Sequence, residues 1–437
     1  MNNGDIMQKA IIAALWLAAA AHAAAAQDSI KIGVLTAIDS AVGPLSSSVL
    51  DGTVDYVTLV NLRDGGVDGR PVEVLTCETR YTLDGHVDCY RELAAQGALV
   101  ASPSSTEGAY ALNRMAFEMK VPVLNNGLGQ TAVADGAVFP YSFGFPGHYL
   151  HAASATIRYL LDENGNDLSG RKIGFVYHDS PFGTEPIALL ERLSAKHGFE
   201  LLLYPVTPPG EDQGEIFGRV AVDQPDNLIL WTVGRMTAVS VGTAAAVDYP
   251  RENMIGVWWT TYEPLMRALG PAADGFKAVN YHSVGYDAAV YNELNERVYF
   301  AEKAHGEMNN IGLIDYNRGL ISGAYLVEIL KEAARGGDLS PEGVRTAMER
   351  LSITTERLAE IGIDDLAPPL SMNCADHTGE GMMRIIVWRA DQRVWRHETD
   401  FISPDAEEID GLIRAQADAF AEAAGVQRRT CAPAGGG

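Results

Sequence analysis

Positive charge is scarce in this sequence. Lys and Arg number 33 against 57 Asp and Glu, which leaves a net charge of −24 over 437 residues. Nucleic acids and anionic lipid surfaces repel a protein of this charge. Beyond residues 1–26, no apolar run is long enough to cross a membrane. We therefore expect a soluble monomer that binds no nucleic acid.

The motifs of common enzyme classes are also missing. Residues 33–37 (GVLTA), in the first predicted strand and its end, lack the G-x-G-x-x-G pattern of dinucleotide-binding proteins. Neither a P-loop nor a G-x-S-x-G nucleophile elbow occurs. No C-x-x-C pair or nearby His cluster has the spacing of a metal site. The sequence thus predicts no cofactor, no metal and no catalytic residue, and an enzyme on a Rossmann-like scaffold is a weaker alternative.

A short apolar run marks the N-terminus. Residues 10–21 (AIIAALWLAAAA) have the length of a signal-peptide core and are too few for a bilayer-spanning helix. Small residues at 24–26 fit a signal-peptidase site, so we expect residues 1–26 to be a signal peptide and the mature chain to begin near Gln27. The prediction is export to the periplasm, and an uncleaved membrane anchor is the alternative.

Cysteine is rare, with four residues in the chain. An even number of cysteines in an exported protein suggests disulfides. Cys77 and Cys89 would close a short local loop, which makes them the first expected pair. Cys374 and Cys431 remain as the second pair and would tie the C-terminal tail back to the body.

Apolar segments of two lengths alternate along the mature chain. Segments of strand length, such as residues 29–36 (SIKIGVLT) and 171–177 (RKIGFVY), are followed by segments with helical spacing. This order predicts βαβ units, and hence an α/β fold with parallel sheets covered on both faces. The chain is longer than one core usually serves, so we expect two lobes. Residues 418–437, rich in Ala, Gly and Arg, predict a loosely held tail.

Three stretches carry a resemblance to a known family. Residues 30–35 (IKIGVL) open the mature chain, residues 61–70 form a glycine-rich turn, and residues 171–179 lead to Phe182 and Gly183. In order and spacing these stretches resemble the type I periplasmic substrate-binding proteins of ABC importers, in the branch of the leucine/isoleucine/valine-binding proteins. The similarity covers nearly the whole mature chain and includes features of an uncharacterised subgroup.

The resemblance implies two Rossmann-like lobes joined by a three-strand hinge, with crossings near Pro146, Lys277 and Ile353. The implied division is lobe 1 at 27–146 and 278–352, lobe 2 at 147–277 and 353–432, and a tail at 433–437. A protein of this kind would bind an amino acid or a related small carboxylate or amide in the cleft. By hinge closure it would deliver the solute to the permease and ATPase subunits of an ABC transporter. A ligand-sensing periplasmic receptor is the alternative.

Ligands of open α/β sheets bind beyond the carboxyl ends of the strands, which singles out two loops of the first lobe. In one of them, Ser104, Ser105 and Thr106 precede a predicted helix. The free N–H groups and the positive end of that helix attract a carboxylate or carbonyl oxygen, and the resemblance implies a carboxylate-binding loop here. The alternative is an ordinary N-cap, in which a hydroxyl serves only its own helix.

The other loop holds Asn126, Gly127 and Gly129. Its glycines allow a ligand to approach the backbone closely. The resemblance implies backbone contacts here, together with a Thr at the position of Gly129, which this chain lacks. A plain turn is the alternative.

The second lobe contributes aromatic residues at predicted strand ends. The candidate ligand contacts are Phe182, Trp231, Gly234, Trp258, Trp259 and Tyr262. Aromatic rings in a cleft can stack on an apolar or planar ligand, although core packing is the commoner fate of a Trp. The amino-acid binders of the family carry a Glu at the position of Trp258, where it holds the ammonium group. A Trp offers only a cation–π contact there, so we expect a carboxylate, amide or aromatic acid rather than a branched-chain amino acid.

Two histidines, His148 and His151, lie three residues apart near a predicted crossing. A metal site needs more ligands, and no nearby carboxylate completes one. We expect these histidines to be surface or hinge residues.

Overall fold

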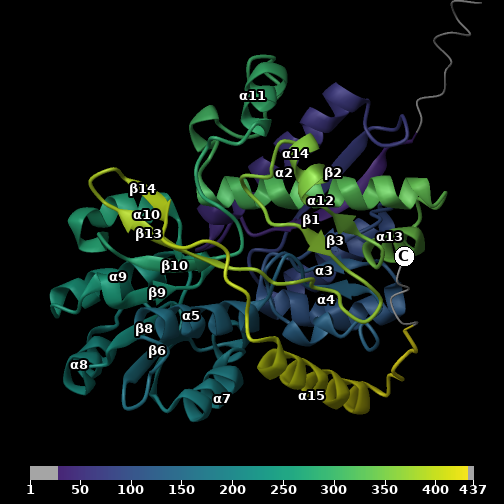
Figure 1. The fold of residues 1–437 in the computed structure, drawn as a ribbon. Helices are drawn as coiled ribbons and strands as arrows, with labels where there is room; N and C mark the ends of the chain where they lie inside the picture. Colours follow the sequence, from purple (N-terminus) through teal and green to yellow (C-terminus); the bar gives the residue numbers. More distant parts are fainter. Residues whose placement is uncertain (1–27, 432–437) are drawn as a thin grey trace, which may run out of the picture.

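The computed structural model describes residues 28–431. The predicted signal peptide and the tail at 433–437 lie outside the described residues. The chain forms two lobes, each built on a β-sheet with helices packed against it (Figure 1). No helix in the described part of the chain combines the length and the apolar character that a membrane crossing needs.

Lobe 1 holds a five-stranded sheet in the order β2-β1-β3-β4-β5, with every neighbouring pair parallel. Its strands are β1 (Ile30–Thr36), β2 (Val72–Glu78), β3 (Ala101–Ser102), β4 (Val123–Leu124) and β5 (Ser142–Phe143). Its main helices are α2 (Gly43–Asp64), α3 (Leu83–Ala95), α4 (Thr106–Met119), α12 (Ile314–Arg335) and α13 (Pro341–Met348).

The long helices α2 and α12 pack closely because glycines lie at their contact. A Cβ on Gly52 would overlap the carbonyl oxygen of Tyr316, and a Cβ on Gly319 would overlap that of Val49. Thr53 donates from Oγ1 to the carbonyl oxygen of Gly319 at 3.0 Å. This contact fixes the N-terminal half of α12 beside the start of α2.

Lobe 2 holds a seven-stranded sheet in the order β14-β13-β10-β9-β8-β6-β7. Its strands are β6 (Lys172–His178), β7 (Glu200–Val206), β8 (Asn227–Trp231), β9 (Met254–Gly256), β10 (Lys277–Asn280), β13 (Arg384–Arg389) and β14 (Val394–His397). Five strands are parallel, whereas β13 and β14 join as an antiparallel edge. Its helices are α5 (Tyr149–Glu163), α6 (Pro181–Thr184), α7 (Ile187–His197), α8 (Gly214–Asp223), α9 (Arg235–Ala246) and α10 (Glu263–Leu269).

Two crossings between the lobes lie later in the chain than the predicted ones. Strand β10 belongs to the second sheet, so the chain leaves lobe 2 after Asn280. The segment with β11 (Ser352–Ile353), α14 (Thr355–Glu360) and β12 (Leu370–Ser371) packs its apolar side chains into the core of lobe 1. The chain therefore returns to lobe 2 only between Met372 and β13, because Ile353 and its successors complete the first core. Helix α11 (Val290–Leu294) also packs in lobe 1.

Both predicted disulfides are present. Cys77 pairs with Cys89, which joins β2 to α3, and Cys374 pairs with Cys431. Disulfides form and persist in oxidising compartments.

The predicted loose tail is wrong for the residues that the structure describes. In Figure 1, helix α15 (Ala406–Ala424) lies below α4 of lobe 1 and beside α7 of lobe 2. Lys196 of α7 binds Asp405 at its start, with 2.6 Å between Nζ and Oδ2. At its end, the ring of Phe420 lies 4.5 Å from that of Phe139, between their centroids. The Ala-rich residues up to Ala424 form an amphipathic helix that contacts both lobes.

Candidate ligand-binding cleft

The carboxyl ends of strands from both lobes meet at a narrow space between the lobes. It consists of two adjoining cavities, a larger one of about 70 Å³ and a smaller one of about 30 Å³. Both are lined by Val42, Leu45, Ser104, Leu128 and Trp259. Lobe 1 forms most of the larger cavity, and among its described lining residues only Trp259, which follows β9, comes from lobe 2. The smaller cavity is lined from both lobes, and its lobe 2 residues are Tyr149, Phe182, Val233 and Trp259. This is the edge at which open α/β sheets bind ligands.

Ser104 lines both cavities and is held by a buried histidine. Its Oγ lies 2.9 Å from Nε2 of His86, and Nδ1 of His86 lies 2.7 Å from the carbonyl oxygen of Thr82. Because that carbonyl can only accept, Nδ1 carries a proton and the neutral ring accepts the hydroxyl hydrogen of Ser104 at Nε2. Burial lowers the pKa of His86, which favours this neutral ring. Ser104 therefore offers oxygen lone pairs to the cavities.

The next two hydroxyls have different surroundings. Ser105 is the N-cap of α4, where its Oγ accepts from the backbone N–H of Gly108 at 3.0 Å, and it lines neither cavity. Thr106 lines the smaller cavity, and its hydroxyl lies 2.9 Å from that of Tyr149 in lobe 2. The capping alternative thus describes Ser105, whereas Ser104 and Thr106 are placed to meet a ligand.

The loop after β4 places its three candidate residues differently. Asn126 lines the larger cavity, and its Nδ2 lies 3.4 Å from Oγ of Ser102. Gly127 has a φ of 75° and accepts a hydrogen bond across the cleft, 3.1 Å from Nε1 of Trp258. Gly129 lines neither cavity. Of these three candidates, only Asn126 lines a cavity, together with Leu128 of the same loop.

A carboxyl group that the sequence did not single out lies against Gly129. Glu185, which follows α6 in lobe 2, accepts a hydrogen bond from the backbone N–H of Thr131 in lobe 1. Its other oxygen, Oε2, occupies the place that a Cβ on Gly129 would need. Burial raises the pKa of Glu185 to about 7. The missing Thr at Gly129 thus leaves room for a carboxyl group that joins the lobes.

The two adjacent tryptophans were both candidate ligand contacts, but only one of them lines the cavities. Trp259 lines both cavities and donates from Nε1 to the hydroxyl oxygen of Tyr149 at 3.0 Å. Trp258 is completely buried, and its ring stacks on that of Tyr149 with 5.4 Å between centroids. They lie in a 3-10 turn, Trp258–Thr260, which sends successive side chains to different sides. Trp258 is thus a packing residue, whereas Trp259 is half-buried and lines the cavities.

Of the other lobe 2 candidates, one lines a cavity and the rest do not. Phe182 lines the smaller cavity. Trp231 is fully buried in the lobe 2 core, and Tyr262 lines neither cavity. Gly234 also lines neither cavity, but a Cβ there would come 3.5 Å from the carbonyl oxygen of Ala41, so it lies where the lobes approach each other.

Sequence reasoning missed a buried arginine that lines the larger cavity. Arg318 extends from α12 of lobe 1 to lobe 2, where its Nη2 donates to the carbonyl oxygen of Trp258 at 3.1 Å. It forms an ion pair with Asp315, one turn earlier on the same helix. The signal was available: an Asp and an Arg three residues apart in an otherwise apolar stretch are expected to pair. Its distance in sequence from the other candidates hid its role.

Comparisons with known proteins decide the family. Residues 29–393 match the sequence profile of the periplasmic binding proteins. The chain belongs to this family. A crystal structure described as an ABC transporter permease from the Pseudomonas fluorescens group is 31% identical, with a TM-score of 0.86 over 93% of this chain and 100% of that one. No curated protein matches the sequence.

More distant structures share the fold of this binding protein. A branched-chain amino acid ABC transporter protein from Thermus thermophilus with bound valine is 17% identical, with a TM-score of 0.74 over 88% of this chain and 99% of that one. A solute binding protein from R. palustris in complex with benzoate is also 17% identical, with a TM-score of 0.68 over 86% and 98% of the two chains. These confirm the predicted type I periplasmic binding protein fold.

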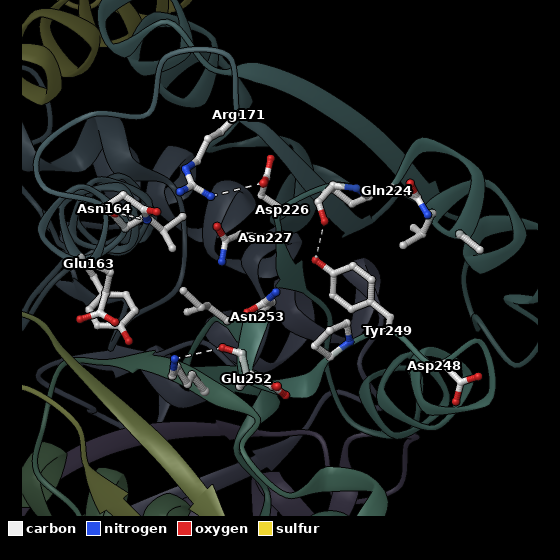
Figure 2. Close-up of a pocket in the computed structure, with 18 of the residues that line it drawn as sticks. Glu163, Asn164, Arg171, Gln224, Asp226, Asn227, Asp248, Tyr249, Glu252 and Asn253 are labelled. Carbon is white, nitrogen blue, oxygen red and sulfur yellow. Dashed lines mark hydrogen bonds and ion pairs between the residues drawn. The ribbon is translucent and has the colours of Figure 1, made fainter.

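The binding protein also has a polar pocket of about 560 Å³ away from the cleft. It lies at the amino ends of β6, β8, β9 and β10, as Figure 2 shows. Arg171 forms an ion pair with Asp226 there, at 3.3 Å, and Lys277 donates to the carbonyl oxygen of Glu252 at 3.0 Å. Because it lies at the edge of the sheet opposite the cleft, we assign it no ligand.

The two histidines near the first crossing are not surface residues. His148 and His151 are buried and stack with 3.6 Å between ring centroids. They lie directly after the segment that joins the two sheets, and Gly381, in the third crossing, leaves no room for a Cβ beside His151. Burial lowers the pKa of both rings, that of His151 to about 3. The hinge therefore contains a neutral histidine pair.

Proposed function

We propose that this periplasmic binding protein captures an amino acid or a related small carboxylate or amide between its lobes and delivers it to an ABC transporter. The observation that carries the proposal is the pair of adjoining cavities, because residues at the strand ends of both lobes line them. A solute bound there would contact both lobes at once. Its binding energy would therefore favour the closed arrangement over the open one.

The lining favours solutes without an ammonium group. Among the described residues, no Asp or Glu lines either cavity. A helix N-terminus beside Thr106 and the rings of Phe182 and Trp259 suit an oxygen acceptor on an apolar or planar body. Structures of the same fold are described with valine, with benzoate and as a fatty acid transporter component.

The partners in this proposal are the solute and the permease and ATPase subunits of an importer, with the binding protein acting as a monomer. Signal-peptide cleavage after residue 26 would release it into the periplasm. The experiment is native mass spectrometry of the purified protein for a bound small molecule, followed by calorimetry with that compound. Reversible one-to-one binding supports the proposal, and turnover of the compound contradicts it.

A further inference from the structure

Arg318 has an unusual position for a charged residue. Its side chain is 1% exposed, yet it lines the larger cavity. The guanidinium carbon lies 4.7 Å from the ring centroid of Trp259 and 5.5 Å from that of Tyr281. Its Nη2 reaches two acceptors of lobe 2, the carbonyl oxygen of Trp258 at 3.1 Å and Oδ1 of Asn280 at 3.4 Å. The group is therefore fixed by both lobes.

One donor of this guanidinium has no partner. Nε of Arg318 is buried and makes no hydrogen bond to the described residues. Leaving a buried donor of a charged group unpaired destabilises the protein. Since Arg318 lines the larger cavity, an acceptor atom of a solute can complete this hydrogen bond.

The charge of Arg318 is already balanced. Asp315, also 1% exposed, binds its Nη1. Glu263 is a second buried carboxyl group close by, and it accepts from the backbone N–H of Ile314 at 2.8 Å. A carboxylate on the solute would add another negative charge to a buried site with one cation, which is costly. A neutral carbonyl oxygen meets the free N–H without that cost.

The same cavity presents acceptors as well. Ser104 donates its hydrogen to His86 and turns lone pairs towards the cavity. Asn126 also lines the cavity, and its Oδ1 is buried without a partner. A primary carboxamide supplies both halves of this pattern, with an oxygen for Arg318 and an N–H group for Ser104 or Asn126.

We infer that Arg318 is a ligand-binding residue and that the solute is a neutral primary carboxamide on a small apolar body. The inference rests on the proposed function and narrows its solute class. The apolar body would lie against Leu45, Leu128 and Trp259, which line both cavities. An ammonium group finds no carboxylate in the lining.

The test uses matched compounds on one carbon skeleton, benzamide, benzoate and benzylamine, and the corresponding series isovaleramide, isovalerate and isopentylamine. Calorimetry on the full-length mature protein measures each dissociation constant. We expect the amide of at least one skeleton to bind about tenfold or more tightly than its carboxylate and amine. Tighter binding of the carboxylate or the amine overturns the inference. Failure of both series and of the natural amino acids contradicts the proposed function itself.

Arg318→Lys then tests the residue, since lysine keeps the charge opposite Asp315 but lacks the Nε–H. We expect it to weaken amide binding about tenfold and to remove the preference for the amide over the carboxylate. Arg357→Lys is the matched control, because Arg357 also pairs with a carboxylate, Glu328, in lobe 1 but lines neither cavity. An Arg318→Lys protein that keeps the wild-type preference overturns the assignment. If that variant does not fold, the preference measured on the wild-type protein still decides the solute class.

Discussion

The carboxyl group of Glu185 occupies the space beside Gly129 that any larger side chain would need. Gly129 belongs to lobe 1 and Glu185 to lobe 2, so this contact exists only while the lobes are together. We expect Gly129→Ala to destabilise the closed protein by about 1–3 kcal/mol through overpacking. Thermal unfolding with Glu185→Ala in a double-mutant cycle checks it. Equal costs of Gly129→Ala with and without Glu185 would show that the two residues do not interact.

The same carboxyl group should make stability depend on pH. Burial raises the pKa of Glu185 from 4.5 to about 7, so the folded state holds this proton more tightly than the unfolded state. The contribution of this proton to the free energy of unfolding is fully present below about pH 4.5 and is lost as the pH rises through about 7. Glu185→Gln should therefore raise the melting temperature relative to wild type more at pH 8 than at pH 5. The exposed Glu191→Gln, as control, should show no such difference.

The histidine pair should change stability with pH in the opposite direction from Glu185. His148 and His151 are held neutral, with the pKa of His151 lowered to about 3. Their contribution is present above the unfolded pKa of about 6.5 and is lost as the pH falls below it. We expect His151→Phe to lose less stability than wild type between pH 7 and pH 5, measured by denaturant unfolding. Parallel losses in the two proteins would mean that other groups carry the acid sensitivity.

Ser104 and Ser105 should respond differently to the same substitution. Ser105→Ala removes the N-cap of α4 and should cost about 1 kcal/mol of stability. Ser104→Ala removes a cavity-facing acceptor and should weaken solute binding about tenfold with little change in stability. Calorimetry and thermal unfolding of both variants separate the two effects. Loss of affinity confined to Ser105→Ala would reverse the assignment.

The two tryptophans provide a similar comparison. Trp258→Ala deletes a fully buried side chain and should cost about 3–5 kcal/mol of stability. Trp259→Ala removes a cavity wall, so we expect weaker solute binding and a smaller loss of stability. If Trp258→Phe, measured by calorimetry, weakened binding more than Trp259→Phe, then Trp258 would be the ligand contact and Trp259 the packing residue.

The sequence predicted the order of strands and helices because hydrophobic periodicity is a local property. The third crossing was misplaced because β11 and β12 are two-residue strands, and nothing local says which core receives Ile353. Loop position relative to the sheet was enough to select Ser104 and Thr106, which line the cavities; their contact with a solute stays a prediction. The tail was misread because α15 gains its stability from packing on both lobes rather than from its composition.

The missed site residues have a common cause. Arg318 reaches the cavity from near the start of α12, far along the chain from the strand-end loops. Glu185 is noticed only once its contact with Gly129 of the other lobe is known. Trp258 and Trp259 point in different directions because of a 3-10 turn, which sequence spacing did not predict. Such features depend on how the two lobes meet, which is long-range information.

The central claim is that a solute binds between the lobes and holds them together. Small-angle X-ray scattering, with and without a solute whose binding calorimetry has established, tests it most directly. We expect a smaller radius of gyration at saturating solute, with a midpoint equal to the calorimetric one, and a weakened response in Ser104→Ala. A solute that binds the wild-type protein tightly and leaves the radius of gyration unchanged would contradict it.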